Sequence, residues 1–433
     1  MGVTVVSAAV GETVVGTLES GRGFRRHLTT IVALGALLRV IRFVVTKWDT
    51  RLLLNDSLYY SAQAQQLAHG VWFREVFVDQ PGAEHGPLTS TLMAIVSWGS
   101  SPFNRQRMVT IVCGVATVAI IGLIGRRIGG ARVGLIAAGI AAIYANLWIN
   151  DGLVMSESVS CLMIVLTLWA LLTWFDRPRL QAAALVGAAA GLGALARSEL
   201  VMFIPAALLV MWAVARGSGR RPWTHVALAG GVTVALMLPW TIFNFARFER
   251  PVLLTTNEGP AWLGANCDPT YYGDVQGGWS LLCLVNDPAN KPGEETSVRS
   301  ARQRREAASY VRHHLHSVPR VVVQRVGRGL DLYALGDMIK GDAGEERERW
   351  ASWIGIVSFW LLAPVAAFGA VMTRRRDRAL LLIPVLIAFV TTVLIYGGHR
   401  IRSSAEPSIV IFVAIAIDRW ATRAGLRWAM PRR

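Results

Sequence analysis

The chain of 433 residues is 53% hydrophobic, has a mean hydropathy of +0.42 and carries a formal net charge of +16. Its repeated apolar runs of about 20 residues are long enough to cross the roughly 30 Å hydrocarbon core of a bilayer, which excludes a soluble globular protein and predicts a polytopic membrane protein. A charge of this size would also suit nucleic-acid binding, but the basic residues lie mainly between the apolar runs, so we expect no nucleic-acid partner.

Ten apolar runs are predicted to be transmembrane helices. In chain order they are residues 27–46, 108–125, 132–149, 157–175, 180–196, 199–215, 225–245, 351–371, 379–397 and 405–422. With a cytoplasmic N-terminus, the inner segments hold 20 of the 44 basic residues but only five acids, as the positive-inside rule requires. We therefore expect an inner, cytoplasmic-membrane protein with a cytoplasmic N-terminal segment (1–26), a transmembrane core (27–245), C-terminal transmembrane helices (351–422) and a cytoplasmic basic tail (423–433).

The first outer loop is predicted to span residues 47–107. A short helix on the membrane surface should begin near Asn55 or Asp56 and end at Gly70. Residues 87–101 are also apolar, but they are too few and too rich in Ser and Thr for a crossing, so they predict an interfacial or re-entrant helix.

The second outer segment, residues 246–350, is neutral overall because it holds 14 basic and 14 acidic residues. Turn-forming residues come first, and residues 298–335 are predicted to be helical. Cys113 and Cys161 lie within spans, whereas Cys267 and Cys283 share this segment. A disulfide between the latter two is expected in an oxidising compartment, with two free thiols as the alternative.

Ionisable residues gather at the outer ends of the predicted helices, where the cost of placing charge near hydrocarbon points to function. They are Arg39 and Arg42, Asp151 and Glu157, Arg197 and Glu199, and Arg400 and Arg402. All fall on the same membrane face as Asp56 and His85. Several cations around one carboxylate suit an anionic lipid headgroup together with a general base, because cations stabilise a departing phosphate and a carboxylate can accept a hydroxyl proton.

A set of short motifs in this order resembles the landmarks of GT-C fold glycosyltransferases, in particular the branch with protein O-mannosyltransferases and the aminoarabinose transferase of lipid A. The motifs are Asp56-Ser57-Leu58-Tyr59-Tyr60, His85-Gly86-Pro87-Leu88, Met155-Ser156-Glu157, Ala196-Arg197-Ser198-Glu199, Pro239-Trp240-Thr241-Ile242-Phe243-Asn244, Thr256-Asn257-Glu258-Gly259 and His399-Arg400-Ile401-Arg402. The resemblance covers about residues 30–420 and implies an all-α, GT-C-like bundle of about ten transmembrane helices with interfacial helices in the first outer loop.

The resemblance implies an enzyme that transfers a sugar, mannose or arabinose-like, from a polyprenyl-phosphate donor to a glycan, lipid or protein acceptor of the cell envelope, with inversion. The family's loop acid corresponds to Asp56, which is expected to activate the acceptor hydroxyl. We expect the donor phosphate at His85, Arg39, Arg197, Arg400 and Arg402, and the substrates at Tyr59, Tyr60, Glu157 (or Asp151) and Asn257.

Two positions depart from the family pattern. Ser57 stands where relatives often carry a second acid, and Gly86 stands where they carry the first proline of the second motif. Ser57 removes a possible metal ligand, so no metal is assigned, although a divalent cation remains an open cofactor.

Simpler interpretations stay open for these residues. Asp56 could cap the surface helix, His85 could be a turn residue, Arg197 could pair with Glu199 or Glu157, and Tyr59 and Tyr60 could belong to an interfacial aromatic belt. The group His313, His314 and His316 resembles a metal site, but no nearby acid completes it. A transporter or flippase of lipid-linked sugars is the alternative function, since it too would place arginines in a ten-helix bundle.

Overall fold

The computed structural model describes residues 21–53, 55–217 and 223–424. Most of the predicted N-terminal segment and basic tail therefore lies outside the described residues. Within the described part of the chain every regular element is a helix, and one isolated antiparallel bridge joins Arg74 to Pro81. The predicted all-α class is confirmed.

A helix occupies each of the ten predicted transmembrane positions. Within the described ranges, seven are long and apolar enough to cross a membrane: α2 (Gly21–Thr46), α5 (Phe103–Gly129), α8 (Glu157–Asp176), η1 (Ser198–Met202) continued by α10 (Phe203–Gly217), α11 (Trp223–Phe245), α18 (Arg349–Met372) and α19 (Arg375–Leu394). Two further apolar helices are shorter, α6 (Ala131–Ile143) and α9 (Leu180–Ala196), and α21 (Glu406–Arg423) carries charged residues at both ends.

The predicted third span, 132–149, is not one continuous helix. It ends as α6 at Ile143 and resumes as the single turn α7 (Ala145–Trp148), because the buried Tyr144 adopts an extended conformation with φ −70° and ψ 117°. The Tyr144 hydroxyl donates a hydrogen bond of 2.8 Å to Oε2 of Glu406. This tertiary contact accompanies the break, and neither proline nor glycine stands at the position.

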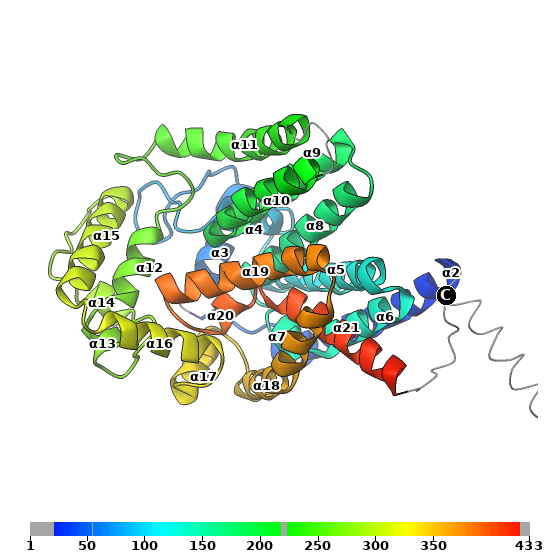
Figure 1. Ribbon diagram of the computed structural model, residues 1–433. Helices are drawn as coiled ribbons and strands as arrows, with labels where there is room; N and C mark the ends of the chain where they lie inside the picture. The colour runs from blue at the N-terminus through cyan, green and yellow to red at the C-terminus, as the bar shows by residue number, and fades with distance from the viewer. Residues whose placement is uncertain (1–20, 54, 218–222, 425–433) are drawn as a thin grey trace, which may run out of the picture.

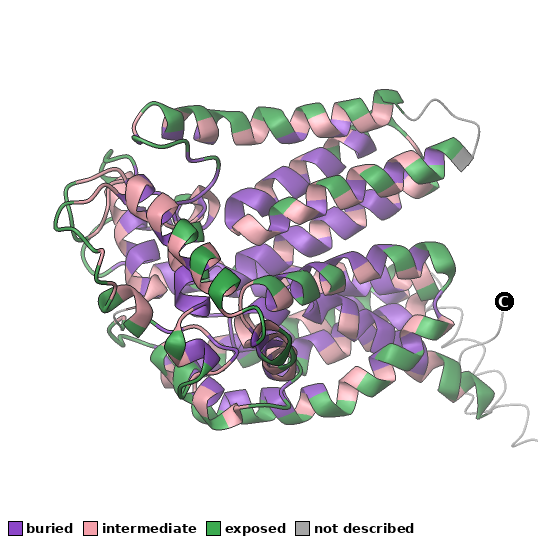
Figure 2. Ribbon diagram, turned by 60° about the vertical axis from the view of Figure 1, so that its left-hand side comes forward, coloured by how far each residue is buried: buried purple, intermediate pink, exposed green. Residues whose placement is uncertain are grey.

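The long helices form a bundle in which α8 is largely enclosed and α11 lies at the periphery. Figure 2 shows buried residues concentrated on the inner helices and exposed residues along the outer ones. Large apolar side chains such as Val45, Leu209 and Leu361 are exposed on the helix surfaces, as expected where a helix faces lipid. Small residues allow close packing: a Cβ at Gly187 of α9 would lie 2.1 Å from the carbonyl oxygen of Ala229 on α11.

Short helices gather at one end of the bundle (Figure 1). They are α3 (Asp56–Ala68), α4 (Pro87–Ala94), α12 (Glu258–Ala265), α13 (Asp268–Tyr271), α14 (Leu282–Val285), α15 (Thr296–His313), α16 (Val318–Gly329), α17 (Leu335–Gly344) and α20 (His399–Arg402). A helix is present at the position of the predicted surface helix, as α3, and residues 87–101 form only the eight-residue α4. The helical stretch predicted over 298–335 is mostly helical but divided, since His314 ends α15 and α16 begins with Pro319 in its first turn.

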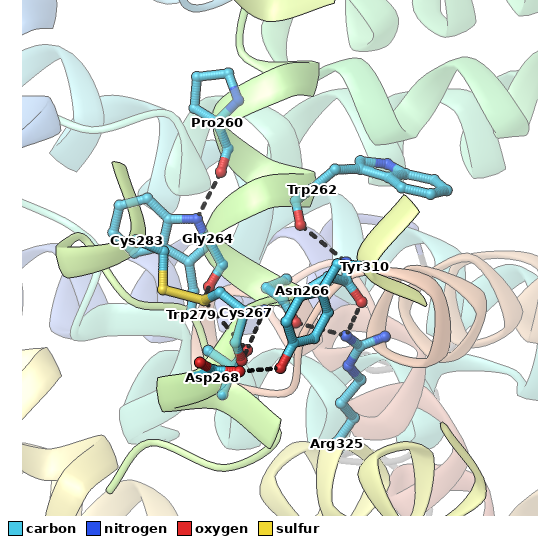
Figure 3. Close-up of a disulfide and its surroundings, with 12 residues drawn as sticks. Pro260, Trp262, Gly264, Asn266, Cys267, Asp268, Trp279, Cys283, Tyr310 and Arg325 are labelled. Atoms are coloured by element: carbon cyan, nitrogen blue, oxygen red, sulfur yellow. Dashed lines mark hydrogen bonds between the residues drawn. A yellow bond between two sulfur atoms is a disulfide. The ribbon is translucent and has the colours of Figure 1, made fainter. Parts of the chain in front are cut away.

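The predicted disulfide between Cys267 and Cys283 is present, and the Cα atoms of the two cysteines are 6.3 Å apart (Figure 3). Around it, Trp279 Nε1 donates to the Pro260 carbonyl at 3.1 Å. Arg325 donates to the Asn266 side chain at 3.0 Å. Cys113 and Cys161 are buried free thiols.

Candidate active site

Asp56 opens α3 without capping it. The preceding residue, Asn55, is the N-cap, and its side-chain oxygen accepts the Ser57 backbone N–H at 2.8 Å. The Asp56 carboxylate is thereby free to face an arginine and a histidine: its Oδ2 lies 2.7 Å from an Arg400 nitrogen, and its Oδ1 lies 3.6 Å from His85 Nε2. Although burial opposes ionisation, Arg400 and His85 lower the pKa of Asp56 well below its usual range, so it is a carboxylate at neutral pH.

Two tyrosines of α3 hold the His85 ring. Tyr60 stacks on it with ring centroids 4.7 Å apart, and Tyr59 meets it edge-on at 5.2 Å. Both tyrosines are buried. Burial disfavours a charged imidazole, but the neighbouring Asp56 carboxylate raises the pKa of His85 above its ordinary value. His85 is therefore packed into the Asp56 site and is not a residue of an exposed turn.

Steric crowding explains why a glycine follows His85. Gly86 caps α4 where that helix starts against the end of α9, and a Cβ at this position would lie 2.3 Å from the Leu195 carbonyl oxygen. The departure from the family's proline therefore coincides with a close backbone approach, which brings the His85 loop next to Arg197.

Arg400 is the centre of the site. Its guanidinium contacts three carboxylates, with nitrogen–oxygen distances of 2.7 Å to Asp56, 2.6 Å to Glu157 and 2.8 Å to Glu345. These acids come from the first outer loop, the start of α8 and the end of α17. Arg400 thus joins three segments that are far apart in the sequence.

Glu157 is the second meeting point. Its Oε1 accepts from Arg400 and from Arg197, the latter at 3.1 Å, and lies 3.6 Å from an Arg347 nitrogen. Its Oε2 is buried and has no hydrogen-bond partner among the residues that the structure describes. Arg197 also donates to Glu199 at 2.5 Å, so both predicted pairings of Arg197 occur. The unpartnered Oε2 leaves the site one acceptor for a substrate hydroxyl.

A charged run between α17 and α18, residues 345–348, joins the site to the helix bundle. Glu345 contacts Arg400 and Arg347, and Glu346 accepts a hydrogen bond of 2.7 Å from the Ser57 hydroxyl. The remaining members bind other outer turns: Arg347 contacts Asn150 and Glu157, and Glu348 contacts Arg42 and Lys47. In sequence this run resembles a solvated charged loop, so Glu345 and Arg347 were not predicted as site residues.

Two further acids lie beside His85 and were also missed. The backbone N–H of Glu84 donates to the Tyr59 hydroxyl at 3.0 Å. Burial raises the pKa of Glu84, and burial together with the Glu84 charge raises the pKa of Glu75 to about 7. No feature of the sequence around Glu75 or Glu84 singles these carboxylates out, because their proximity depends on how the loop folds.

Three predicted donor or substrate residues do not join the Asp56 cluster. Arg39 forms a buried pair with Asp151 at 2.5 Å and donates to the carbonyls of Gly35 and Ala142. Arg402 forms ion pairs with Asp331 and Glu406. The Asn257 side chain makes no hydrogen bond within the described part of the chain, although the neighbouring Thr256 N–H donates to the carbonyl of Ala83, two residues before His85. We therefore leave Arg39 and Arg402 out of the donor-phosphate group.

Arginine side chains occupy the space between these carboxylates. Asp56, Glu157 and Glu345 each have one oxygen in contact with the Arg400 guanidinium. Among the described residues, no group of three or more His, Cys, Asp or Glu side chains is arranged to hold a metal. In the other candidate metal group, His313, His314 and His316, the His314 ring stacks on the Tyr310 ring with ring centroids 4.1 Å apart.

The chain is similar to known membrane transferases in part of its sequence and in its fold. A family model described as dolichyl-phosphate-mannose-protein mannosyltransferase matches residues 85–243, from His85 to Phe243. A search of curated protein sequences finds no match.

Two solved structures share the architecture. The archaeal oligosaccharyltransferase AglB from Archaeoglobus fulgidus, in complex with an inhibitory peptide and a dolichol-phosphate, is 15% identical with a TM-score of 0.59; the alignment covers 94% of this chain and 52% of AglB. ArnT from Cupriavidus metallidurans in the apo state is 13% identical with a TM-score of 0.52, covering 92% of this chain and 61% of ArnT. The chain therefore spans about half the length of AglB.

The all-helical bundle agrees with these similarities. The chain has the GT-C fold that these polytopic membrane transferases share, and its residues 85–243 match the mannosyltransferase family model.

Proposed function

We propose that this protein is an inverting membrane glycosyltransferase that moves a mannose or arabinose-like sugar from a polyprenyl-phosphate donor to an acceptor hydroxyl of the cell envelope. The observation that carries the proposal is the Asp56 carboxylate held between His85 and Arg400 at the end of a GT-C bundle. The dolichol-phosphate bound to AglB, which shares this fold, supports a lipid-phosphate donor.

Asp56 serves as the general base in this proposal. In a single displacement, the acceptor oxygen forms a bond to the anomeric carbon while the bond from that carbon to the phosphate oxygen breaks. The acceptor proton passes to the Asp56 carboxylate, and the negative charge leaves with the polyprenyl phosphate. Attack from the face opposite the leaving group inverts the anomeric centre.

Donor binding would also activate the base. Arg400 lowers the pKa of Asp56 in the resting arrangement, which makes the carboxylate a weak proton acceptor. A donor phosphate that draws Arg400 toward itself weakens this pairing, so the pKa of Asp56 rises toward its usual range. The same guanidinium then stabilises the leaving phosphate, assisted by Arg197 and His85.

The donor and the acceptor would meet at the outer face of the cytoplasmic membrane. Two observations support this orientation: the excess of arginines in the segments at the opposite ends of the helices, and the Cys267–Cys283 disulfide in the outer segment, since disulfides form in oxidising compartments. Tyr59, Tyr60 and the free Oε2 of Glu157 are then available to the sugar.

The proposal is tested with purified protein in liposomes supplied with labelled polyprenyl-phosphate mannose or arabinose and an envelope extract as acceptor. Label passing to the extract with wild type, and not with Asp56→Asn, supports the transferase. The control is Asp79→Asn, which changes an acid on the same loop whose side chain is 94% exposed. Protein-dependent movement of the intact lipid-linked sugar across the bilayer, without transfer, would favour a flippase instead.

A further inference from the structure

His399 lies between two buried aspartates. Its Nε2 is 2.7 Å from Asp331 Oδ1, and its Nδ1 is 2.8 Å from Asp342 Oδ2. The side chains of these aspartates are 0% and 7% exposed, and that of His399 is 13% exposed. A neutral imidazole has only one N–H, so both contacts can be hydrogen bonds to carboxylates only when both ring nitrogens carry a proton.

The other charged groups around the ring agree with an imidazolium. Arg402 donates to the second oxygen of Asp331 at 2.6 Å, and an Arg347 nitrogen lies 3.8 Å from Asp342 Oδ1. The Ser352 hydroxyl donates to Asp342 at 2.7 Å. Burial disfavours the charged ring, but the two carboxylates overcome it and raise the pKa of His399 to about 9. Loss of one His399 proton would leave one ring nitrogen without an N–H, so one of the two buried aspartates would lose its hydrogen bond to the ring.

His399 lies directly before Arg400 in the chain. His399 and Arg400 are neighbours in the four-residue helix α20. Their partners are also close in sequence, because Asp342 in α17 binds His399 and Glu345 at the end of α17 binds Arg400 at 2.8 Å. The two contacts therefore form parallel links between α20 and α17, and the buried link to His399 is the less exposed of the two.

We propose that His399 is a positioning residue, which as an imidazolium fastens α20 to Asp331 and Asp342 and thereby holds the Arg400 guanidinium on Asp56 and Glu157. The assignment rests on the proposed transferase function, since Arg400 is the group whose placement matters for the donor phosphate. His399 touches neither Asp56 nor Glu157 and acts through Arg400.

The expected signature is an alkaline loss of transfer activity. A histidine with a raised pKa holds both links below that pKa and loses one of them as pH rises through about 9. Asp342→Asn removes one carboxylate, so the His399 pKa falls and the alkaline limb of the pH–rate profile moves to lower pH by about 1 unit or more. His85 has a raised pKa as well, but it is paired with Asp56 and not with Asp342, so its titration cannot produce this shift.

His399→Gln gives the complementary measurement. An arginine displaced by about 1 Å is expected to lower the rate constant for transfer by about 100-fold. The loss should appear in kcat over the whole pH range, and the alkaline limb near pH 9 should disappear. A melting curve recorded for each variant identifies any that has simply unfolded, and Asp342→Asn, which keeps the histidine, then carries the test.

The protonation state is read independently of activity from histidine ¹⁵N spectra of labelled protein in liposomes. The chain has eight histidines, and we expect an imidazolium signal that persists at pH 8 and is absent from His399→Gln. A folded Asp342→Asn variant with the wild-type alkaline limb, or a neutral His399 at pH 8, would overturn the positioning role alone. A wild-type protein that transfers no sugar at pH 7 would overturn the proposed function and this role with it.

Discussion

Replacing Arg400 by glutamine should move the acid limb of the pH–rate profile upward. In the wild type, the guanidinium lies 2.7 Å from Asp56 Oδ2 and opposes the effect of burial, which by itself raises the pKa of that carboxylate. An arginine at this distance lowers an aspartate pKa by about 1–3 units, and each unit corresponds to about 1.4 kcal/mol. Since His85 remains beside Asp56 at 3.6 Å, we expect the smaller part of this range in the variant.

The sign of the effect follows from the lowered pKa. The wild-type carboxylate stays ionised as the pH falls from 8 to 5, so its transfer rate should not depend on Asp56 protonation there. In Arg400→Gln the rate should fall as protons titrate Asp56 at a pH about 1–2 units higher than in the wild type. The assay is the initial rate of sugar transfer from pH 8 down to the lowest pH at which both proteins remain folded. An acid limb at the same pH in both proteins would refute the assignment of Arg400 as the cation that sets the Asp56 pKa.

Three further changes test other parts of the structure. Asp151→Asn leaves its buried arginine partner without a counter-ion and should lower the free energy of unfolding by about 3–5 kcal/mol, measured by thermal or denaturant unfolding in detergent. Gly86→Ala places a Cβ 2.3 Å from an α9 carbonyl oxygen and should lower the free energy of unfolding by about 1–3 kcal/mol, with loss of activity. The control is Gly139→Ala in α6, where nothing lies within 4 Å of the added Cβ, and this change should be neutral or stabilising. Equal melting temperatures for the two variants would contradict the close approach at Gly86. Replacing Cys267 and Cys283 together by serine should cost about 3 kcal/mol because the bond closes a loop of 16 residues, and an unchanged melting curve under reducing conditions would show that the bond contributes nothing.

The sequence was sufficient for the helix positions because each depends on a continuous apolar run. It also predicted that Asp56, His85 and Arg400 share one face, since each lies in a predicted outer segment. Tyr144 shows where this approach fails. Its break in the third span accompanies a contact with Glu406, which is 262 residues away along the chain, and no local signal marks it.

The pairing of acidic with basic side chains could not be predicted from the sequence either. Arg39 and Arg400 have the same predicted location, at the outer end of a span, yet Arg39 is taken by Asp151 and only Arg400 reaches Asp56. The decisive partner of Arg400 outside the motifs, Glu345, lies in a charged run that resembles a solvated loop. Which acid meets which arginine depends on how the outer segment folds onto the bundle, and this information is not local.

The most direct test of the central claim is a single-turnover transfer measurement on Asp56→Asn with saturating donor, alongside wild type and Asp79→Asn. Donor binding is measured in the same liposomes by retention of labelled polyprenyl-phosphate sugar. If Asp56 is the base, the donor should still bind to Asp56→Asn while the single-turnover rate falls by about 100-fold or more, because general-base catalysis contributes about 10²–10⁴-fold. Transfer at the wild-type rate by Asp56→Asn, with donor bound, would contradict the role assigned to this carboxylate.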